Sequence, residues 1–286
     1  MNVKKLLCAV IVAGICAGVA APARAQSRPL VTEDPETVPA GYILLEAGLD
    51  FLYGVPYPVT GLKGNLTRIG TFGLSFGVSS IAEIQVDGGL ANRLGITAID
   101  PGAPLASRYT GSVDATAGFE DMVVGAKVRF ASETESRPAF AFRFATKLPL
   151  VGTDTGLGTG TTDFNVGLLV AKTVRSTRVA ANVGVGIMGD PVEGDRHNEL
   201  LTYGMSFARA VRTGAEVVAE FNGRLDLGSD EPPVGTDSRM MIRVGGRFTR
   251  GPVRLDTGLL LGVTDRDPSW GVTFGATWVF KAFDVK

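Results

Sequence analysis

The sequence predicts an all-β protein, a transmembrane antiparallel up-and-down β-barrel of about twelve strands that folds after a signal peptide is cleaved. Three observations support this prediction. The chain begins with an export signal, and its apolar residues alternate with polar ones from residue 43 to residue 281. The connections between the alternating segments are short and long in turn.

The first 25 residues have the three parts of a signal peptide. Lys4 and Lys5 form a positive start, residues 6–21 form an apolar stretch, and Ala-Arg-Ala at 23–25 forms a cleavage site. A membrane-anchoring helix is the alternative, but the apolar stretch is short for a span and no charged flank follows it. We therefore expect residues 1–25 to be removed when the chain is exported.

The composition of the mature chain excludes several kinds of site. Cys8 and Cys16 both lie in the signal peptide, so the mature chain has no disulfide, thiolate metal site or cysteine nucleophile. Cleavage removes three of the 28 basic residues and leaves 25 against 29 acidic ones, a net charge of −4. A mildly acidic chain without a basic block is not expected to bind nucleic acid. After residue 25 no apolar run reaches the ~18 residues of a spanning helix.

The last segment, 270–281, shows the alternation most clearly. One face would carry Trp270, Val272, Phe274, Ala276, Trp278 and Phe280. Glycines and threonines would occupy the other face. Successive side chains of a strand point to opposite faces, whereas a helix would scatter these residues around its axis. The segment is therefore predicted to be a strand.

Eleven further segments alternate in the same way. The predicted strands are 43–53, 66–78, 82–91, 119–131, 138–148, 162–173, 178–188, 198–210, 214–226, 237–249, 252–263 and 270–281. Such lengths suit tilted membrane strands better than a soluble sheet. The connections after the second, fourth, sixth, eighth and tenth strands are short and the others are long, as in outer-membrane barrels with short periplasmic turns.

A soluble sandwich or propeller would also alternate, so the two faces have to be compared. The polar face is rich in glycine, serine and threonine, which suits a crowded barrel interior, and aromatic residues gather near the strand ends as two girdles would require. We therefore predict an extended periplasmic leader at 26–42, the barrel at 43–283 and a short tail at 284–286. The leader could plug the lumen or contact a periplasmic partner, and a loose segment is the default.

Several short stretches resemble the family named for the MetA pathway of phenol degradation. They are Arg28-Pro29-Leu30-Val31-Thr32-Glu33-Asp34, Lys147-Leu148-Pro149, residues 156–163, residues 261–265 and Trp270-Gly271-Val272. The resemblance spans nearly the whole mature chain. It implies an outer-membrane barrel with a role in handling aromatic or other small hydrophobic compounds. It brings no established catalytic residues.

Charged residues on the polar face are the candidate lumen lining. They are Glu46, Asp50, Glu83, Asp87, Asp121, Lys127, Arg129, Arg143, Lys147, Glu216, Glu220, Arg224, Arg239, Arg243, Arg247, Arg254 and Asp256. They could pair and fill the interior, because buried charges need partners, or line a pore that selects solutes by charge. Twelve tilted strands give a backbone cylinder roughly 24 Å wide, which leaves at most a narrow channel.

Other motifs give no catalytic, cofactor or metal site. The glycines at 156, 158 and 160 lack the lysine of a phosphate-binding loop and fit a flexible external loop. A barrel-borne lipid hydrolase would need a serine beside His197, and Ser206 lies much further along the predicted strand. One histidine without cysteine makes a zinc site improbable.

The sequence therefore predicts a non-enzymatic, porin-like protein of the bacterial outer membrane that transports small solutes passively. A closed structural barrel whose loops bind a partner is the alternative, with the lipid hydrolase as a third. The expected partners are outer-membrane lipid, lipopolysaccharide, the barrel-assembly machinery and an unidentified solute.

Overall fold

The computed structural model describes residues 27–228 and 232–285, and the predicted signal peptide at 1–25 lies outside them. The described residues form thirteen strands and two short 3-10 helices, η1 (Ala106–Arg108) and η2 (Thr153–Thr155). The strands are β1 (Tyr42–Tyr57), β2 (Leu62–Gly77), β3 (Ala82–Ile99), β4 (Ala115–Gly118), β5 (Met122–Ala131), β6 (Ala139–Leu148), β7 (Asp163–Val174), β8 (Thr177–Gly189), β9 (His197–Arg212), β10 (Ala215–Asp226), β11 (Arg239–Arg250), β12 (Val253–Gly262) and β13 (Trp270–Lys281). No helix among these residues is long and apolar enough to cross a membrane.

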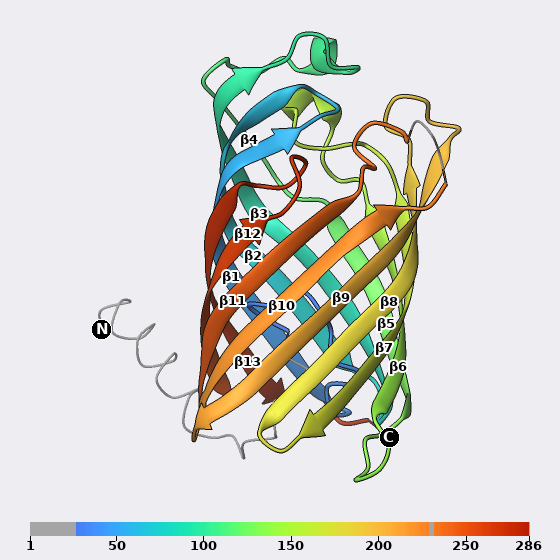
Figure 1. Ribbon diagram of the computed structural model, residues 1–286, viewed down its shortest axis with the longest axis vertical. Helices are drawn as coiled ribbons and strands as arrows, with labels where there is room; N and C mark the ends of the chain where they lie inside the picture. The colour runs from blue at the N-terminus through green and yellow to red at the C-terminus, as the bar shows by residue number, and fades with distance from the viewer. Residues whose placement is uncertain (1–26, 229–231, 286) are drawn as a thin grey trace.

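Twelve of the strands form a closed antiparallel barrel, which confirms the predicted fold class (Figure 1). The first and last strands complete the cylinder, with Tyr42 opposite Lys281 and Tyr53 opposite Trp270. β4 is the additional strand, and it pairs with residues 92–95 of β3 at the loop end of the wall. Short turns lie at the bottom of Figure 1 and longer loops at the top.

The first three strands are longer than predicted, so two predicted loops are partly wrong. Residues 54–57 and 62–65 belong to the β1–β2 hairpin, and β3 continues to Ile99. The pairing of β1 with β2 shifts register between Gly48 and Leu49 and again between Leu52 and Val55. A bulge moves every later side chain to the opposite face, which interrupts the period of two and hides the continuing strand.

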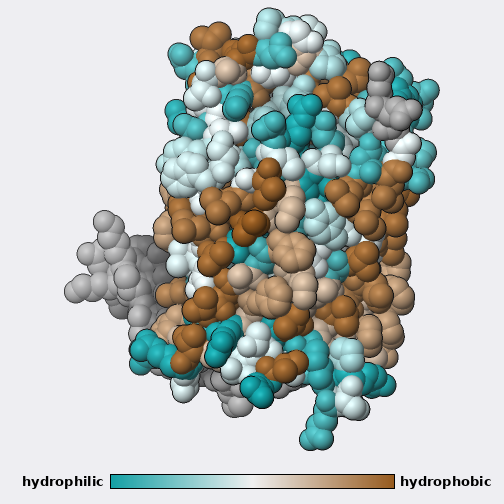
Figure 2. Space-filling model, in the orientation of Figure 1, coloured by the Kyte–Doolittle hydropathy of each residue, from teal (hydrophilic) through white to brown (hydrophobic). Residues whose placement is uncertain are grey.

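Apolar side chains cover the outer face of the barrel and charged side chains are buried inside it, the reverse of a soluble protein. On the outer face Val183 is 49% exposed and Leu259 is 57% exposed, whereas Lys127 and Glu83 are each 1% exposed inside. Figure 2 shows hydrophobic residues gathered over the middle and lower part of the face in view, with hydrophilic residues more frequent above and below them. Toward the loop end of the barrel the rings of Tyr53 and Trp270 stack at 4.2 Å. Such a face is stable against lipid and not against water.

We predicted a loose periplasmic leader, and this prediction is wrong. Residues 27–41 lie inside the barrel. Figure 1 shows them in blue within the lower half of the cylinder. Leu30, Thr32 and Val38 are buried, as are several of the wall residues around them. The leader is acidic and the wall facing it is rich in basic side chains, so insertion pairs charges that would otherwise stay buried alone.

A small apolar core lies on the inner face of the wall near the loop end. Val55, Leu62, Leu66 and Leu94 are buried together, and Leu157 from the loop between β6 and β7 packs against them. The bulge in β1 after Leu52 brings Val55 to the inside, whereas the uninterrupted period would have placed it on the outer face. The lumen therefore has an apolar region that the alternation alone did not predict.

Candidate functional site

The inner face of the barrel is the candidate site, and the predicted lumen residues fall into three groups on it. Those that contact the leader, through ion pairs or hydrogen bonds, are Glu46, Glu83, Lys127, Arg129, Arg143, Glu220, Arg247 and Asp256. Those that line the cavity above it are Asp50, Asp87, Asp121, Lys147, Arg224, Arg239 and Arg243. Arg143 and Asp50 are shared between the two groups, because Asp50 also pairs with Arg28 of the leader at 3.8 Å. Glu216 and Arg254 form the third group, in which Arg254 Nη2 lies 4.0 Å from Glu216 Oε2.

The predicted ladder between β10 and β11 is present. These strands place Glu220 opposite Arg243 and Glu216 opposite Arg247. Arg243 Nη1 lies 2.7 Å from Glu220 Oε1, and Arg247 Nη1 lies 3.8 Å from Glu216 Oε2. The first pair is close and buried, whereas the second is longer because Arg247 also donates to the leader.

Three acidic residues of the leader each meet basic side chains of the wall. Glu33 pairs with Arg143 at 2.7 Å and with Lys127 at 3.2 Å. Asp34 pairs with Arg178 of β8 at 2.7 Å, and Glu36 pairs with Arg129. Sequence reasoning missed Arg178 and the leader carboxylates as site residues. The signal was an acidic segment ahead of strands whose polar face is basic.

Backbone groups of the leader are also hydrogen-bonded to the wall. The amides of Val31 and Thr32 both donate to the carboxylate of Glu220, each with a contact at 2.8 Å. The amide of Val38 donates to Glu83 Oε2 at 2.5 Å. Arg247 donates through Nε to the carbonyl oxygen of Arg28 at 2.7 Å. Charged acceptors and donors make these hydrogen bonds stronger than neutral ones.

The environment of Glu33 shows which charge state the leader carries. Burial alone would raise the pKa of its carboxyl group. The charges of Arg143 and Lys127, with hydrogen bonds from Gln85 and Lys127, outweigh burial and hold the pKa at about 2. Glu33 is therefore ionised at neutral pH and attracts the basic wall in its charged form.

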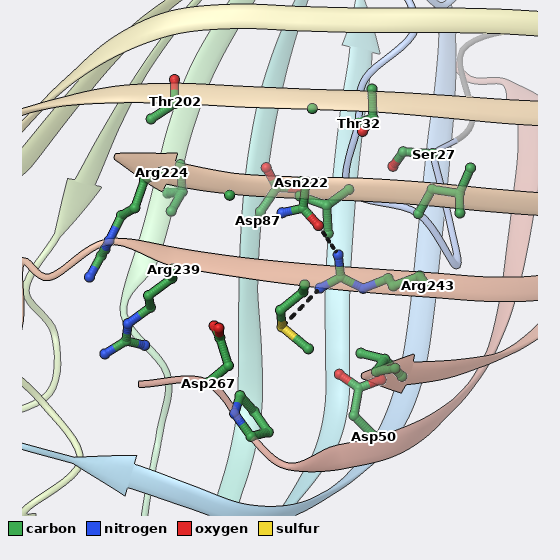
Figure 3. Close-up of a pocket in the computed structure, with 18 of the residues that line it drawn as sticks. Ser27, Thr32, Asp50, Asp87, Thr202, Asn222, Arg224, Arg239, Arg243 and Asp267 are labelled. Atoms are coloured by element: carbon green, nitrogen blue, oxygen red, sulfur yellow. Dashed lines mark hydrogen bonds between the residues drawn. The ribbon is translucent and has the colours of Figure 1, made fainter. Parts of the chain in front are cut away.

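A cavity of about 960 Å³ lies in the lumen above the leader, and leader residues 27–33 form its floor. Figure 3 shows its polar side chains, with Ser27 and Thr32 on the leader side and Arg243 donating to Asn222. Arg243 Nη1 lies 2.5 Å from Asn222 Oδ1. The wall carries acidic, basic and apolar side chains together, so the cavity is not a filter for a single sign of charge.

The glycine-containing loop between β6 and β7 lies over the mouth of this cavity. Thr60 donates to the carbonyl oxygen of Gly156 at 2.8 Å, and Thr116 donates to that of Thr155 at 2.7 Å. Gly156 has a φ of +77°, which favours glycine. We predicted a flexible external loop with no phosphate site. The loop is external, and its contacts tie it to β2, β4 and the β1–β2 turn.

His197 and Ser206 do not form the dyad that a barrel hydrolase would need. His197 is the exposed first residue of β9, and Ser206 lies nine positions along the same strand in the buried interior. At the rise of a β-strand this separation is roughly 30 Å. Among residues 27–228 and 232–285 no group of three histidine, cysteine or acidic side chains is placed to hold a metal ion.

Comparison with known proteins identifies the fold class. No family model and no curated protein sequence matches the chain. The chain is similar in structure to the COG4313 outer membrane channel from Pseudomonas putida F1, with a TM-score of 0.60, 13% identity and coverage of 86% of this chain and 98% of that one. It is also similar to the NanC porin, with a TM-score of 0.51, 7% identity and coverage of 84% and 100%. At these identities the likeness shows that the chain has the fold of outer-membrane β-barrels.

Proposed function

We propose that the chain is a passive, non-enzymatic channel for small solutes, and that its leader closes the lumen from the periplasmic side. The main support for this proposal is the position of the leader directly below the cavity. Residues 27–33 form the floor of a cavity of about 960 Å³, and hydrogen bonds to Glu220 are among the contacts that hold them to the wall. Such contacts can break and re-form without any change in the barrel strands.

Two similar structures support this proposal through what their names say. One is an outer membrane channel and the other a porin. The sequence resemblance to the phenol-degradation family points the same way, toward small hydrophobic or aromatic compounds, and the apolar core beside the cavity offers such a compound a surface. Together these features favour transport over catalysis.

A disulfide between leader and wall tests the proposal directly. A Cβ added at Gly204 of β9 would lie 3.6 Å from Thr32 Cβ, which is within the range of natural disulfides. The mature chain has no other cysteine once residues 1–25 are removed. The double variant T32C/G204C should therefore cross-link the leader inside the lumen under oxidising conditions.

We expect ion current through planar bilayers from the wild type and from the reduced double variant, and none from the oxidised one. The single variants T32C and G204C, treated identically, control for the oxidant. Equal current from the oxidised and reduced double variant would show that the leader does not close the path. No current from either form would favour the alternative, a closed structural barrel whose leader is a permanent part of its interior.

A further inference from the structure

Arg224 and Arg239 form an unusual pair on the cavity wall. They are direct cross-strand neighbours of β10 and β11, and both line the cavity. Like charges directly opposite each other on neighbouring strands are destabilising. Figure 3 shows both side chains extending to the same side of their strands. The arrangement therefore lowers stability unless an anion lies beside the two guanidinium groups.

The two side chains differ in their partners from three other cations that line the cavity. Arg143, Arg243 and Lys147 each have a carboxylate oxygen at 2.7 Å. Arg224 instead donates to the backbone oxygens of Asp237 and Gly235 and to the sulfur of Met188. Arg239 Nε is buried without a hydrogen-bond partner among the described residues.

Three carboxylates lie near this pair. Asp163 acts on Arg224 alone and pairs with Lys147 at 2.7 Å, whereas Asp237 and Asp267 act on both arginines and each has another partner. Asp237 Oδ1 pairs with Arg266 at 3.2 Å, and its Oδ2 is buried without a hydrogen-bond partner among the described residues. Asp267 Oδ2 accepts from the amides of Met240 and Thr264 and from the Thr264 hydroxyl group. Both acids act on Arg224 and Arg239 only through longer-range electrostatics, with no ion pair within 4.0 Å between them and these arginines among the described residues. The charge of the pair is only partly balanced.

The same cavity has apolar walls. Leu52, Val55 and Leu66 line it from β1 and β2, and Leu157 lines it from the loop over its mouth. Met241 and Leu260 line it from β11 and β12, next to the arginine pair. A ligand that fits both features has an anionic group at one end and an apolar body at the other.

We propose that Arg224 and Arg239 bind the carboxylate of a small amphipathic organic anion whose apolar part lies in this cavity. Guanidinium groups match carboxylates in shape and can donate two parallel hydrogen bonds to each. The ligand would supply the negative charge that the pair lacks. The inference rests on the proposed function, in that the anion is the solute that the channel admits.

Binding of benzoate to the purified full mature chain in detergent, measured by isothermal titration calorimetry, tests the inference. Benzamide, which is neutral and nearly the same shape, tests the charge requirement. We expect benzoate to bind about tenfold or more tightly than benzamide, and the double variant R224Q/R239Q to lose that preference. The matched control is R93Q/R108Q, which removes two exposed positive charges and should keep it.

Heat-dependent gel mobility should first show that each variant is folded. Equal benzoate affinity in the wild type and R224Q/R239Q would overturn the inference, as would equal affinity of the wild type for benzoate and benzamide, or no detectable benzoate binding. These binding results are independent of whether the protein conducts ions. A wild type that binds benzoate through the pair but carries no current would refute the channel and keep the binding site.

Discussion

Lys127 and Glu83 show how charged residues are paired inside this barrel. Their side chains are each 1% exposed and lie 3.0 Å apart. Lys127 also contacts Glu33 and the backbone oxygen of Asp34. Desolvating two charges is costly, and only close pairing with further hydrogen bonds offsets that cost. The pair joins β3, β5 and the leader at one point.

Replacing Lys127 with methionine should therefore be strongly destabilising. The change leaves Glu83 buried without its cation, and we expect the free energy of unfolding to fall by about 3–5 kcal/mol. Urea unfolding followed by tryptophan fluorescence measures this loss. K172M is the control, because Lys172 contacts the exposed turn at 133–135 and should have little effect. A K127M variant as stable as K172M would contradict this account.

For single residues, the sequence predicted the face of the strand on which a side chain lies better than it predicted the residues that the side chain contacts. Because alternation assigns a face to every strand residue, it placed Glu220 and Arg243 inside and opposite each other, where they pair. Alternation cannot show which wall residues meet a segment outside the strands. It also failed beyond Leu52, where a bulge exchanged the faces and brought Val55 inside.

The leader lies inside the barrel, and its charges make its docking depend on pH. The pKa of Glu33 is about 2 in the docked leader, against an ordinary 4.5, because Arg143 and Lys127 outweigh the effect of burial. A lowered pKa stabilises the docked state fully above pH 4.5. That stabilisation is lost as the pH falls from 4.5 toward 2.

We therefore expect channel current to rise as the pH is lowered from 4.5 toward 2. In this range protonation of the undocked carboxyl group draws the leader out of the lumen. The variant E33Q lacks the titrating group, so this part of the rise should be absent and its current at neutral pH should be higher. Oxidised T32C/G204C is the control for general acid effects. A rise of the same size in the oxidised form would assign it to the barrel and not to the leader.

Sequence reasoning found the leader as an element but not its location. Three prolines and three acidic residues indicated an extended, charged segment before β1. Its docking depends on Arg129, Lys127, Arg143 and Arg178, which come from three strands that only the closed barrel brings together. A linear pattern contains no information about that convergence.

The whole molecule depends on an outer face that lipid covers. Val183 lies at the middle of β8 and points outward, 49% exposed. A charged side chain there must enter the apolar interior of the bilayer. We expect V183R to lower the free energy of unfolding in lipid vesicles by about 2–4 kcal/mol.

The control for this prediction is V192R, in the loop between β8 and β9. Val192 is 44% exposed, similar to Val183, but lies beyond the end of the strand. Urea titrations of both variants in vesicles would separate the effect of depth from that of charge. Equal losses of stability would show that Val183 does not face the bilayer interior.

At this scale the sequence was most informative. The period of two, the alternation of short and long connections and the aromatic final strand predicted the closed barrel that is observed. These features can be read from the spacing of residues along the chain, because each membrane strand must keep its apolar side chains on the lipid-facing side. The extension of the wall by β4 was not predicted, because its four residues are too few to show a period.

The position of Arg28 has a consequence for assembly. Gly48 of β1 and Gly275 of β13 stand opposite each other where the two ends of the barrel meet. A Cβ added to either glycine would lie 2.3 Å from the guanidinium group of Arg28. The binding place for Arg28 therefore does not exist until the first and last strands have joined. Closure of the cylinder must therefore precede or accompany the placement of Arg28, whereas the leader's contacts with β5, β6, β8 and β10 do not depend on that closure.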